Sequence, residues 1–308
     1  MYDCYQKESR CKVKAIFLNN EILVRYFSKK FSVLENLRYL CTEKNIQIHH
    51  FILCNLCYLC SEMKNLDTRT SIRKYAKREV SDDLLRQLLS QAERTQTMGN
   101  LQLYSVVITR DALMKERLAP AHFNQPMVTE APVVLTFCAD FRRTTRWAQC
   151  RQAEPGYDNF LSFMNAATDA LLYCQTFCCL ADETGLGYCF LGTTVYQPQT
   201  IIDVLHLPQL VMPVATITLG WPDEQPAQSD RLPLEAIVHY ETYHEYTPAD
   251  IDRHFTAKEQ LPENQEFVRI NNKQTLAQVF TDIRYTRRDN EALSQTLLDV
   301  LRHQGFLP

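Results

Sequence analysis

The first 62 residues of this 308-residue chain lack glycine and proline altogether, although seven glycines and thirteen prolines follow them. Average usage would place about seven such residues in a stretch of this length. The same stretch holds six of the twelve cysteines and a single alanine, beside many Asn, Ile and Lys residues. This composition resembles translated A/T-rich DNA, and Met63 offers a natural start. We therefore expect residues 1–62 to be a non-native N-terminal extension from a misassigned start, with little ordered structure.

Two other interpretations of this stretch remain open. In "CNLCYLC", Cys54, Cys57 and Cys60 carry ligand atoms for a zinc or iron–sulfur site, and His49 and His50 precede them. Their even spacing lacks the separated second pair of a zinc motif. The longer "FILCNLCYLC" would suit an apolar helix lying on a membrane or on the main body. We favour the misassigned start and expect no metal site.

The chain also lacks long hydrophobic runs and a strong net charge. No segment reaches the roughly 18 apolar residues that span a bilayer, and "MYDCYQKESRCKVK" lacks the order of regions in a signal peptide. A formal charge of −3 creates no field that draws the chain to nucleic acid or an anionic membrane. Cysteines spread over a large chain indicate free thiols. We expect a cytoplasmic protein without nucleic-acid or membrane partners, in which any anion site is local.

The chain has an ordinary supply of core residues after Met63. With 45% hydrophobic and 22% charged residues it is typical of a soluble globular protein, and we expect one domain over residues 63–308. Ser81, followed by two aspartates, predicts a helix start, and the leucines after it recur at helical spacing. The polar stretch 253–308 suits packing against a second subunit.

Short strand patterns alternate with helical ones. The predicted strands are rich in β-branched and apolar residues, and the first two read as largely buried. They are "LYSVVIT" (103–109), "PVVLTFCA" (132–139), "YCFL" (188–191) and "PVATITLGW" (213–221), with a short helix "PQTIIDVL" at 198–205. This succession indicates an α+β sandwich.

A long helix is predicted over residues 158–184. Small and apolar residues occupy most of its faces, and no Gly or Pro interrupts it, so it should be central and heavily buried. Its three cysteines are expected to serve packing. Gly185 and Gly187 are expected to end it, as glycine does where φ is positive.

A cation cluster stands near the start of this domain. In "RTSIRKY" (69–75), Arg69 and Arg73 flank the hydroxyl of Ser71, and guanidinium and hydroxyl groups together suit a phosphate. If a helix follows directly, its N–H groups would strengthen the grip. An exposed basic turn is the alternative for these residues alone.

Four further segments favour a ligand site. "TQTMGNLQ" (95–102) is a small, polar loop in which Gly99 lets a flat ligand approach the backbone, and Gln125 offers an amide that donates and accepts. "FLGTT" (190–194) ends a strand with a glycine, and Arg231 adds a cation after the last strand.

The order of these segments resembles the FMN-dependent nitroreductase family. The resemblance runs from Leu66 to Tyr246 through "RTSIRKY", "TQTMGNLQ", "FCADFRR", "ETGLGYCFLG", "LHLPQLVMPVATITLGWPDE" and "RLPLEAIVHYETY", with a looser echo at "LLDVLRHQGF". The chain is most similar to the major oxygen-insensitive, NADPH-dependent nitroreductases and related flavin reductases. The resemblance implies an α-β-α sandwich with a mixed, mainly antiparallel central sheet and a long buried central helix.

The resemblance also implies a site for non-covalently bound FMN. Its phosphate would be surrounded by Arg69, Thr70, Ser71, Arg73 and Arg231. Its ring would be faced by Gln125 and followed along the polar edge by backbone groups of Leu191, Gly192 and Thr193. Because family members are homodimers with both flavins at the interface, the partner's flavin would be reached by Thr97, Met98, Gly99 and Leu101.

Three positions depart from the family pattern. Thr70 stands where relatives often have arginine, although Arg69 beside it supplies a charge. Ser229 stands in place of a lysine, which removes one phosphate contact. Thr193 stands in place of a second glycine and narrows the space over that edge of the ring.

The flavin would carry the chemistry, and no side chain is implied as catalytic in the strict sense. Hydride from NADPH or NADH would pass through flavin N5 to a nitroaromatic, quinone or flavin acceptor in a ping-pong cycle. Cations for the 2′-phosphate of NADPH would come from the C-terminal region, where Arg269 and Lys273 in "RINNK" are our candidates and "RYTRR" (284–288) is the alternative. A sensor or storage flavoprotein without significant turnover is the rival function.

Overall fold

The computed structural model describes residues 15–18, 21–24 and 64–308. The chain divides into two units, Met1–Glu62 and Met63–Pro308. In the first unit, strands β1 (Ala15–Leu18) and β2 (Glu21–Val24) pair antiparallel. The cysteines and histidines of the metal interpretation lie outside the described residues, as does most of the stretch expected to be an extension.

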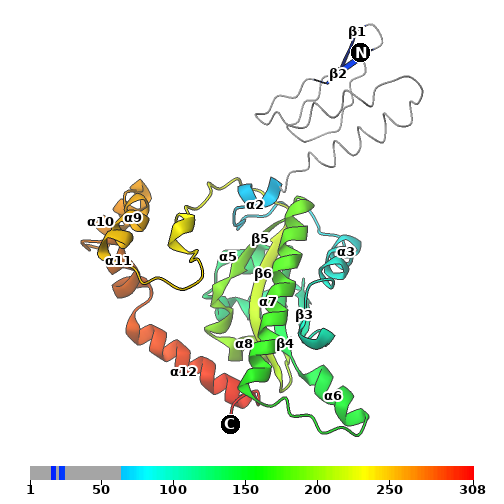
Figure 1. The fold of residues 1–308 in the computed structure, drawn as a ribbon. Coiled ribbons are helices and arrows are strands. Elements are labelled where there is room, and N and C mark those ends of the chain that lie inside the picture. The colour runs from blue at the N-terminus through cyan, green and yellow to red at the C-terminus, as the bar shows by residue number, and fades with distance from the viewer. Residues whose placement is uncertain (1–14, 19–20, 25–63) are drawn as a thin grey trace. The chain divides into compact units, whose positions relative to one another are not determined.

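A four-stranded sheet forms the centre of the second unit, in the order β3-β4-β6-β5 with antiparallel neighbours throughout (Figure 1). Its strands are β3 (Tyr104–Thr109), β4 (Val133–Asp140), β5 (Gly187–Leu191) and β6 (Val211–Gly220). Strand β4 is buried along its whole length, as expected. The expectation of a largely buried strand was wrong for β3, which forms an edge of the sheet and leaves Ile108 44% exposed.

Helix α7 (Phe160–Glu183) crosses one face of the sheet and confirms the predicted central helix. The Asn159 side chain accepts a hydrogen bond from the Ser162 amide at its start, and Gly185, at φ +81°, follows its end. Phe177 packs there against Phe137 of β4. The opposite face of α7 is less buried than expected, because it exposes Phe160, Leu161, Met164, Leu171 and Leu172.

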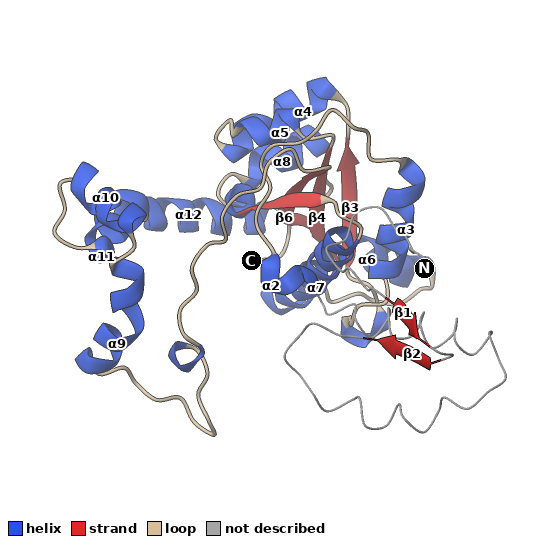
Figure 2. Cartoon of the chain, turned by 90° about the horizontal axis from the view of Figure 1, so that it is seen from above, coloured by secondary structure: helices blue, strands red, loops and turns tan. Residues whose placement is uncertain are grey.

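Three helices cover the other face of the sheet, as Figure 2 shows. They are α4 (Ala112–Leu118), α5 (Pro126–Glu130) and α8 (Pro198–Leu205), the last with the bounds that the sequence predicts. Leu118, Met127 and Ile201 from these helices pack with Leu191 of β5. Helices on both faces of an antiparallel sheet make the α-β-α sandwich that was expected.

Helices at the rim complete the domain. The predicted helix after Ser81 is α3 (Asp82–Ala92), and the Ser81 hydroxyl accepts from the Leu84 amide at 3.3 Å. Two further rim helices are α2 (Lys64–Thr68) and α6 (Arg142–Cys150). No described helix has the length and apolar character needed to cross a lipid bilayer.

The C-terminal arm, which we define as residues 248–286, lies apart from the sheet in Figures 1 and 2. It carries α9 (Pro248–Glu259), α10 (Pro262–Ile270) and α11 (Leu276–Val279). Helix α12 (Arg287–His303) then returns to the domain. Val300, Leu301 and Phe306 pack with Met212 of β6, so the end of the chain is anchored in the core.

Candidate functional site

The basic segment 69–75 runs beside β5 and does not enter a helix. The Ile72 amide donates to the Tyr188 carbonyl at 2.9 Å, and the amides of Arg73 and Lys74 donate to Glu224 Oε1 at 2.5 and 3.0 Å. These backbone donors lower the pKa of the Glu224 carboxyl. No helix follows this segment directly, so the condition for helix N–H groups to strengthen the grip on an anion is not met.

Two glycines allow this segment to lie against the sheet. Gly187 and Gly220 face each other across β5 and β6. A Cβ on Gly187 would lie 2.6 Å from Ile72 Cγ1, and one on Gly220 would lie 2.7 Å from Tyr75 Cδ1. Gly187 was expected to end the long helix through a positive φ, but it begins β5 and its role is this close approach.

Tyr75 ties the segment to the central strands. Its hydroxyl lies 2.7 Å from the Ile72 carbonyl and 2.7 Å from Thr218 Oγ1 on β6. Burial raises the pKa of this hydroxyl, so the phenol stays protonated and keeps a hydrogen to donate. The contact with Thr218 holds the end of the basic segment against β6.

Arg69 and Arg73 lie on the segment that runs beside β5, since the Ile72 amide between them donates to the Tyr188 carbonyl at 2.9 Å. Burial raises the pKa of the Cys189 thiol on β5, and the positive charges of Arg73 and Arg69 both oppose that rise. Burial also raises the pKa of Asp182 at the end of α7, and a hydrogen bond from the Tyr188 hydroxyl and the charge of Arg69 oppose that rise. The structure thus places the two cations that the sequence paired beside the same strand.

The segment before Arg231 is joined to the segment before Arg69. The side-chain Nε2 of Gln228 donates to the Asp67 carbonyl at 2.7 Å. The exposed Arg231 guanidinium donates to the Asp230 carbonyl at 2.8 Å. Thr70 and Ser71 lie half-buried between the arginines.

The turn after β5 packs on the segment that carries Gln125. Residues Gly192–Val195 form a short 3-10 helix, and a Cβ on the exposed Gly192 would meet nothing within 4 Å. His122 Nδ1 lies 2.9 Å from Thr193 Oγ1. Gln125, half-buried, is the N-cap residue of α5. The structure therefore brings Gln125 and the 191–193 turn together through His122, a residue that the sequence did not single out.

The loop with Thr97, Met98, Gly99 and Leu101 is held by α7. Asp169, 1% exposed, accepts from the Met98 amide at 2.9 Å and from the Leu103 amide at 3.1 Å. Gly99 takes a left-handed φ of +56°. Asp169 was not predicted, although an acid inside an apolar helix is a recognisable sign of a buried partner.

The same loop lies far from the arginine cluster of its own chain. It contacts α7 at Asp169, whereas Arg69 acts at Asp182, and thirteen residues of α-helix extend about 20 Å. Beside the loop is a cavity of about 360 Å³ that Phe141 and Tyr157 line with stacked rings 4.7 Å apart. Within a single chain, the two sets of predicted flavin contacts therefore lie too far apart to touch the same flavin phosphate.

Arg269 and Lys273 lie on the C-terminal arm, away from both sets. Arg269 donates to both carboxylate oxygens of Glu266 at 2.6 and 2.7 Å, and Lys273 lies 3.0 Å from Asp282 Oδ2. The Arg284 guanidinium, from the alternative "RYTRR", stacks over Phe267 at 4.4 Å. Both candidate cations thus already have a carboxylate partner.

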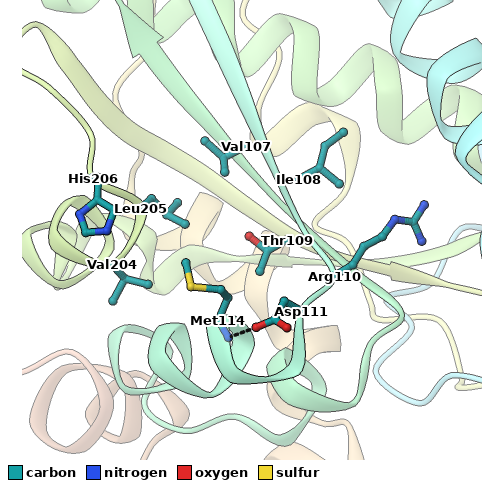
Figure 3. A pocket seen from close by; sticks show the side chains of 9 residues that line it. All are labelled: Val107, Ile108, Thr109, Arg110, Asp111, Met114, Val204, Leu205 and His206. Atoms are coloured by element: carbon teal, nitrogen blue, oxygen red, sulfur yellow. Dashed lines mark hydrogen bonds between the residues drawn. The ribbon is translucent and has the colours of Figure 1, made fainter.

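A second cavity of about 270 Å³ lies between β3, α4 and α8 (Figure 3). Figure 3 shows the Arg110 side chain pointing away from His206, and that guanidinium binds Asp82 at 2.9 Å. Asp111 accepts from the Met114 amide as the cap of α4. These groups already have structural partners, so we do not assign the function to this cavity.

The chain is similar in sequence and fold to known proteins. Residues 66–221 match the model of the nitroreductase family. The FMN reductase [NAD(P)H] of Bacillus subtilis is 30% identical over 215 residues, covering 69% of this chain and 86% of that protein. The solved structure of NfrA2 from B. megaterium is similar with a TM-score of 0.68 and 28% identity, over 79% of this chain and 96% of the other. A Bacteroides fragilis protein of known crystal structure is 60% identical with a TM-score of 0.78, over 79% and 99% of the two chains.

Proposed function

The chain belongs to the nitroreductase family, and we propose that it is an FMN-dependent oxidoreductase that uses NAD(P)H to reduce nitroaromatic, quinone or flavin acceptors. The observation that carries the proposal is the position of the segment with Arg69 and Arg73 against β5, where the Ile72 amide donates to the Tyr188 carbonyl, on the strand that leads into the Gly192–Val195 turn. The similarity to an FMN reductase [NAD(P)H] over most of the chain supports the same reaction class.

The residues at this place fit FMN. Two guanidinium groups with Thr70 and Ser71 between them offer forked donors and hydroxyls to a phosphate, and neither arginine forms an ion pair within the described part of the chain. The exposed backbone at Gly192 has room for a flat ring to approach, since nothing surrounds its α-carbon on that side. The Gln125 amide can donate to and accept from the ring.

FMN, when bound, would supply the redox chemistry, passing hydride from NAD(P)H through its N5 to the acceptor in a ping-pong order, because both substrates use one face. The protein's part is to bind and orient. Backbone groups of Leu191, Gly192 and Thr193 would donate along the polar edge of the ring, where negative charge develops. No side chain of this chain is assigned as an acid or base.

We also propose that the protein works as a homodimer. The exposed face of α7 carries Phe160, Leu161, Met164, Leu171 and Leu172, an apolar surface that a second copy would cover. The loop at Gly99 lies about 20 Å of helix from its own arginine cluster, which suits a loop that completes the flavin site of the partner. The cytoplasm is the expected compartment.

For the nicotinamide we propose Arg269 and Lys273 as contacts of a 2′-phosphate. In their present geometry Glu266 and Asp282 compensate both charges. A phosphate would have to replace these ion pairs, which are weak because they are exposed to solvent. Turnover with NADPH and NADH at equal concentration tests this, and a preference for NADH would rule the assignment out.

One optical experiment tests the proposed function. The purified protein should be yellow, lose its visible absorption when NADPH is added without air, and regain it when a nitroaromatic or quinone follows. A colourless protein that does not take up FMN would contradict the cofactor. A yellow protein that resists bleaching would favour FMN binding without turnover.

A further inference from the structure

His122 lies beneath the turn after β5 with none of its surface exposed. It ends the 3-10 helix Ala119–His122, three residues before Gln125. Its Nδ1 lies 2.9 Å from Thr193 Oγ1, while its Nε2 has no hydrogen-bond partner in the part of the chain that the structure describes. Burying an imidazole with only one hydrogen bond costs free energy, because the second ring nitrogen loses its contact with water. The bond to Thr193 is therefore the one interaction that offsets this cost.

The imidazole is neutral at working pH. Burial lowers the pKa of His122 to about 4, because a charged ring would carry two N–H donors into an apolar surrounding that offers one partner. The helices in contact with this segment contribute Leu118, Met127 and Ile201 to that surrounding. The bond to Thr193 is therefore a neutral one and does not change through the range of pH 5 to 9.

The backbone conformation of the two residues after His122 sets the position of Gln125. Phe123 and Asn124 both take left-handed conformations, with φ of +54° and +53°, which two non-glycine residues adopt only when their surroundings demand it. The Asn124 amide donates to the Ala119 carbonyl at 2.9 Å, and the Gln125 amide donates to the His122 carbonyl at 3.2 Å. The position of Gln125 is thus set from the same residue that holds Thr193.

A second contact braces the same pair of segments. The Phe123 ring lies 6.3 Å from the Tyr196 ring, in the residue that follows the turn. The Tyr196 amide in turn donates to the Thr193 carbonyl at 3.0 Å. Two contacts, one polar and one aromatic, therefore join the Gln125 segment to the 191–193 turn.

We propose that His122 is a positioning residue for the flavin edge, a role that rests on the proposed function. Its hydrogen bond turns the Thr193 hydroxyl toward the interior, so that position 193 presents its backbone to the ring. The same bond keeps Gln125 and the 191–193 turn at one separation. This explains how Thr193 can stand where the family pattern has glycine, since its hydroxyl is directed away from the ligand.

The test compares variants that keep or remove this bond. In His122→Asn the amide occupies the place of Nδ1 and can still bind Thr193, whereas in His122→Gln it matches Nε2 and cannot. His122→Leu removes the bond, Thr193→Val removes the hydroxyl at constant shape, and Thr193→Ser keeps it. The readouts are the dissociation constant of FMN from quenching of flavin fluorescence, and the reduction potential of the bound FMN.

We expect His122→Leu, His122→Gln and Thr193→Val each to weaken FMN binding about five- to tenfold, the effect of about one hydrogen bond. His122→Asn and Thr193→Ser should stay within about twofold of the wild type on the same grounds. The double variant His122→Leu/Thr193→Val should be no weaker than the weaker single variant, because both remove one bond. The reduction potential should move in the variants that lose the bond and stay in those that keep it.

Equal FMN affinity and potential in all variants would overturn the role, as would losses that multiply in the double variant. If His122→Leu does not fold, the pair Thr193→Val and Thr193→Ser decides the matter, and equal affinities of these two would overturn it. A wild-type protein that binds no FMN would overturn the proposed function and this role together, whereas unchanged variants of an FMN-binding protein overturn the role alone.

Discussion

Two pairs of cations, one beside the central sheet and one on the C-terminal arm, differ in what surrounds them. Arg69 and Arg73 lie on the segment beside β5 and form no ion pair within the described part of the chain. Arg269 and Lys273 each bind a carboxylate of the arm, at 2.6 and 3.0 Å. The two pairs of cations therefore differ in whether a carboxylate of the described chain compensates their charge.

This difference in pairing depends on whether the nearest carboxylate accepts hydrogen bonds from backbone amides or from the cationic side chain. Beside the sheet, Glu224 accepts from the backbone amides of Arg73 and Lys74, and the Arg73 guanidinium forms no ion pair with a carboxylate among the described residues. On the arm, Glu266 lies three residues before Arg269 on one helix turn and takes its side chain. A cation whose local carboxylate is already satisfied is available to an external anion, and one with a local partner must first exchange it.

The largest expected effect is on the sheet side of this comparison. Replacing both Arg69 and Arg73 by alanine should raise the FMN dissociation constant about 100-fold or more, because charge-assisted bonds contribute about 1.5 to 3 kcal/mol each. Flavin fluorescence titration measures this. Arg269→Ala is the matched control and should bind FMN as the wild type does. Unchanged binding in the double variant would remove the phosphate assignment.

A smaller effect is expected from the close approach that places the cluster. Gly187→Ala puts a Cβ 2.6 Å from Ile72 Cγ1, which should cost about 1 to 3 kcal/mol and push the basic segment off the sheet. Thermal unfolding should show a Tm lower by roughly 2 to 4 °C for each kcal/mol. Gly156→Ala, where a Cβ meets nothing within 4 Å, is the control. Equal Tm values would mean that the segment can move aside freely.

On the arm the expected effects on the KM for NADPH are smaller, and replacing the carboxylate of Glu266 should change it in the opposite direction from replacing Arg269. Glu266→Gln should free Arg269 and lower the KM for NADPH about two- to threefold, and Arg269→Ala should raise it by a similar factor, since solvent weakens an exposed ion pair. Steady-state kinetics with both nucleotides checks this, with NADH as the internal control. Equal changes in KM for NADH and NADPH would contradict a contact between Arg269 and the 2′-phosphate.

The smallest expected effect concerns residues 1–62, which we propose are an extension outside the working protein. Removing them should leave folding, FMN content and turnover unchanged, because both cation pairs lie in the unit Met63–Pro308. Circular dichroism, flavin absorption and NADPH oxidation check the three properties. A truncated protein that is soluble but inactive would show that this stretch takes part in function.

Elements with a strong local pattern could be predicted from the sequence. Helix α8 has the predicted bounds, Ser81 caps α3, and Gly185 ends α7. Helical periodicity, caps and a glycine at positive φ depend on neighbours a few residues away, so they are readable in one chain. The same holds for the pairing of Arg69 with Arg73, which one short segment carries.

Other features could not be predicted because their causes lie far along the chain. Glu224 accepts from the Arg73 amide 151 residues away, and His122 meets Thr193 across 71 residues. The burial of β3 was overestimated because an apolar strand pattern does not tell which strand lies at the edge. Gly187 was assigned to a helix end. The structure shows that this position needs a glycine because Ile72, which is distant in the sequence, packs directly against it.

The sequence by itself determined helices α3, α7 and α8, the four strands of the central sheet, the order of the motifs, and the residue types available for an anion. Only the tertiary structure decided which of those groups are still available: the amides at Arg73 and Lys74 bind Glu224, while the Arg73 guanidinium forms no ion pair within the described part of the chain. Local structure follows from the chemistry of neighbours in the chain. Whether a donor is satisfied follows from partners that folding brings within 3 Å of it.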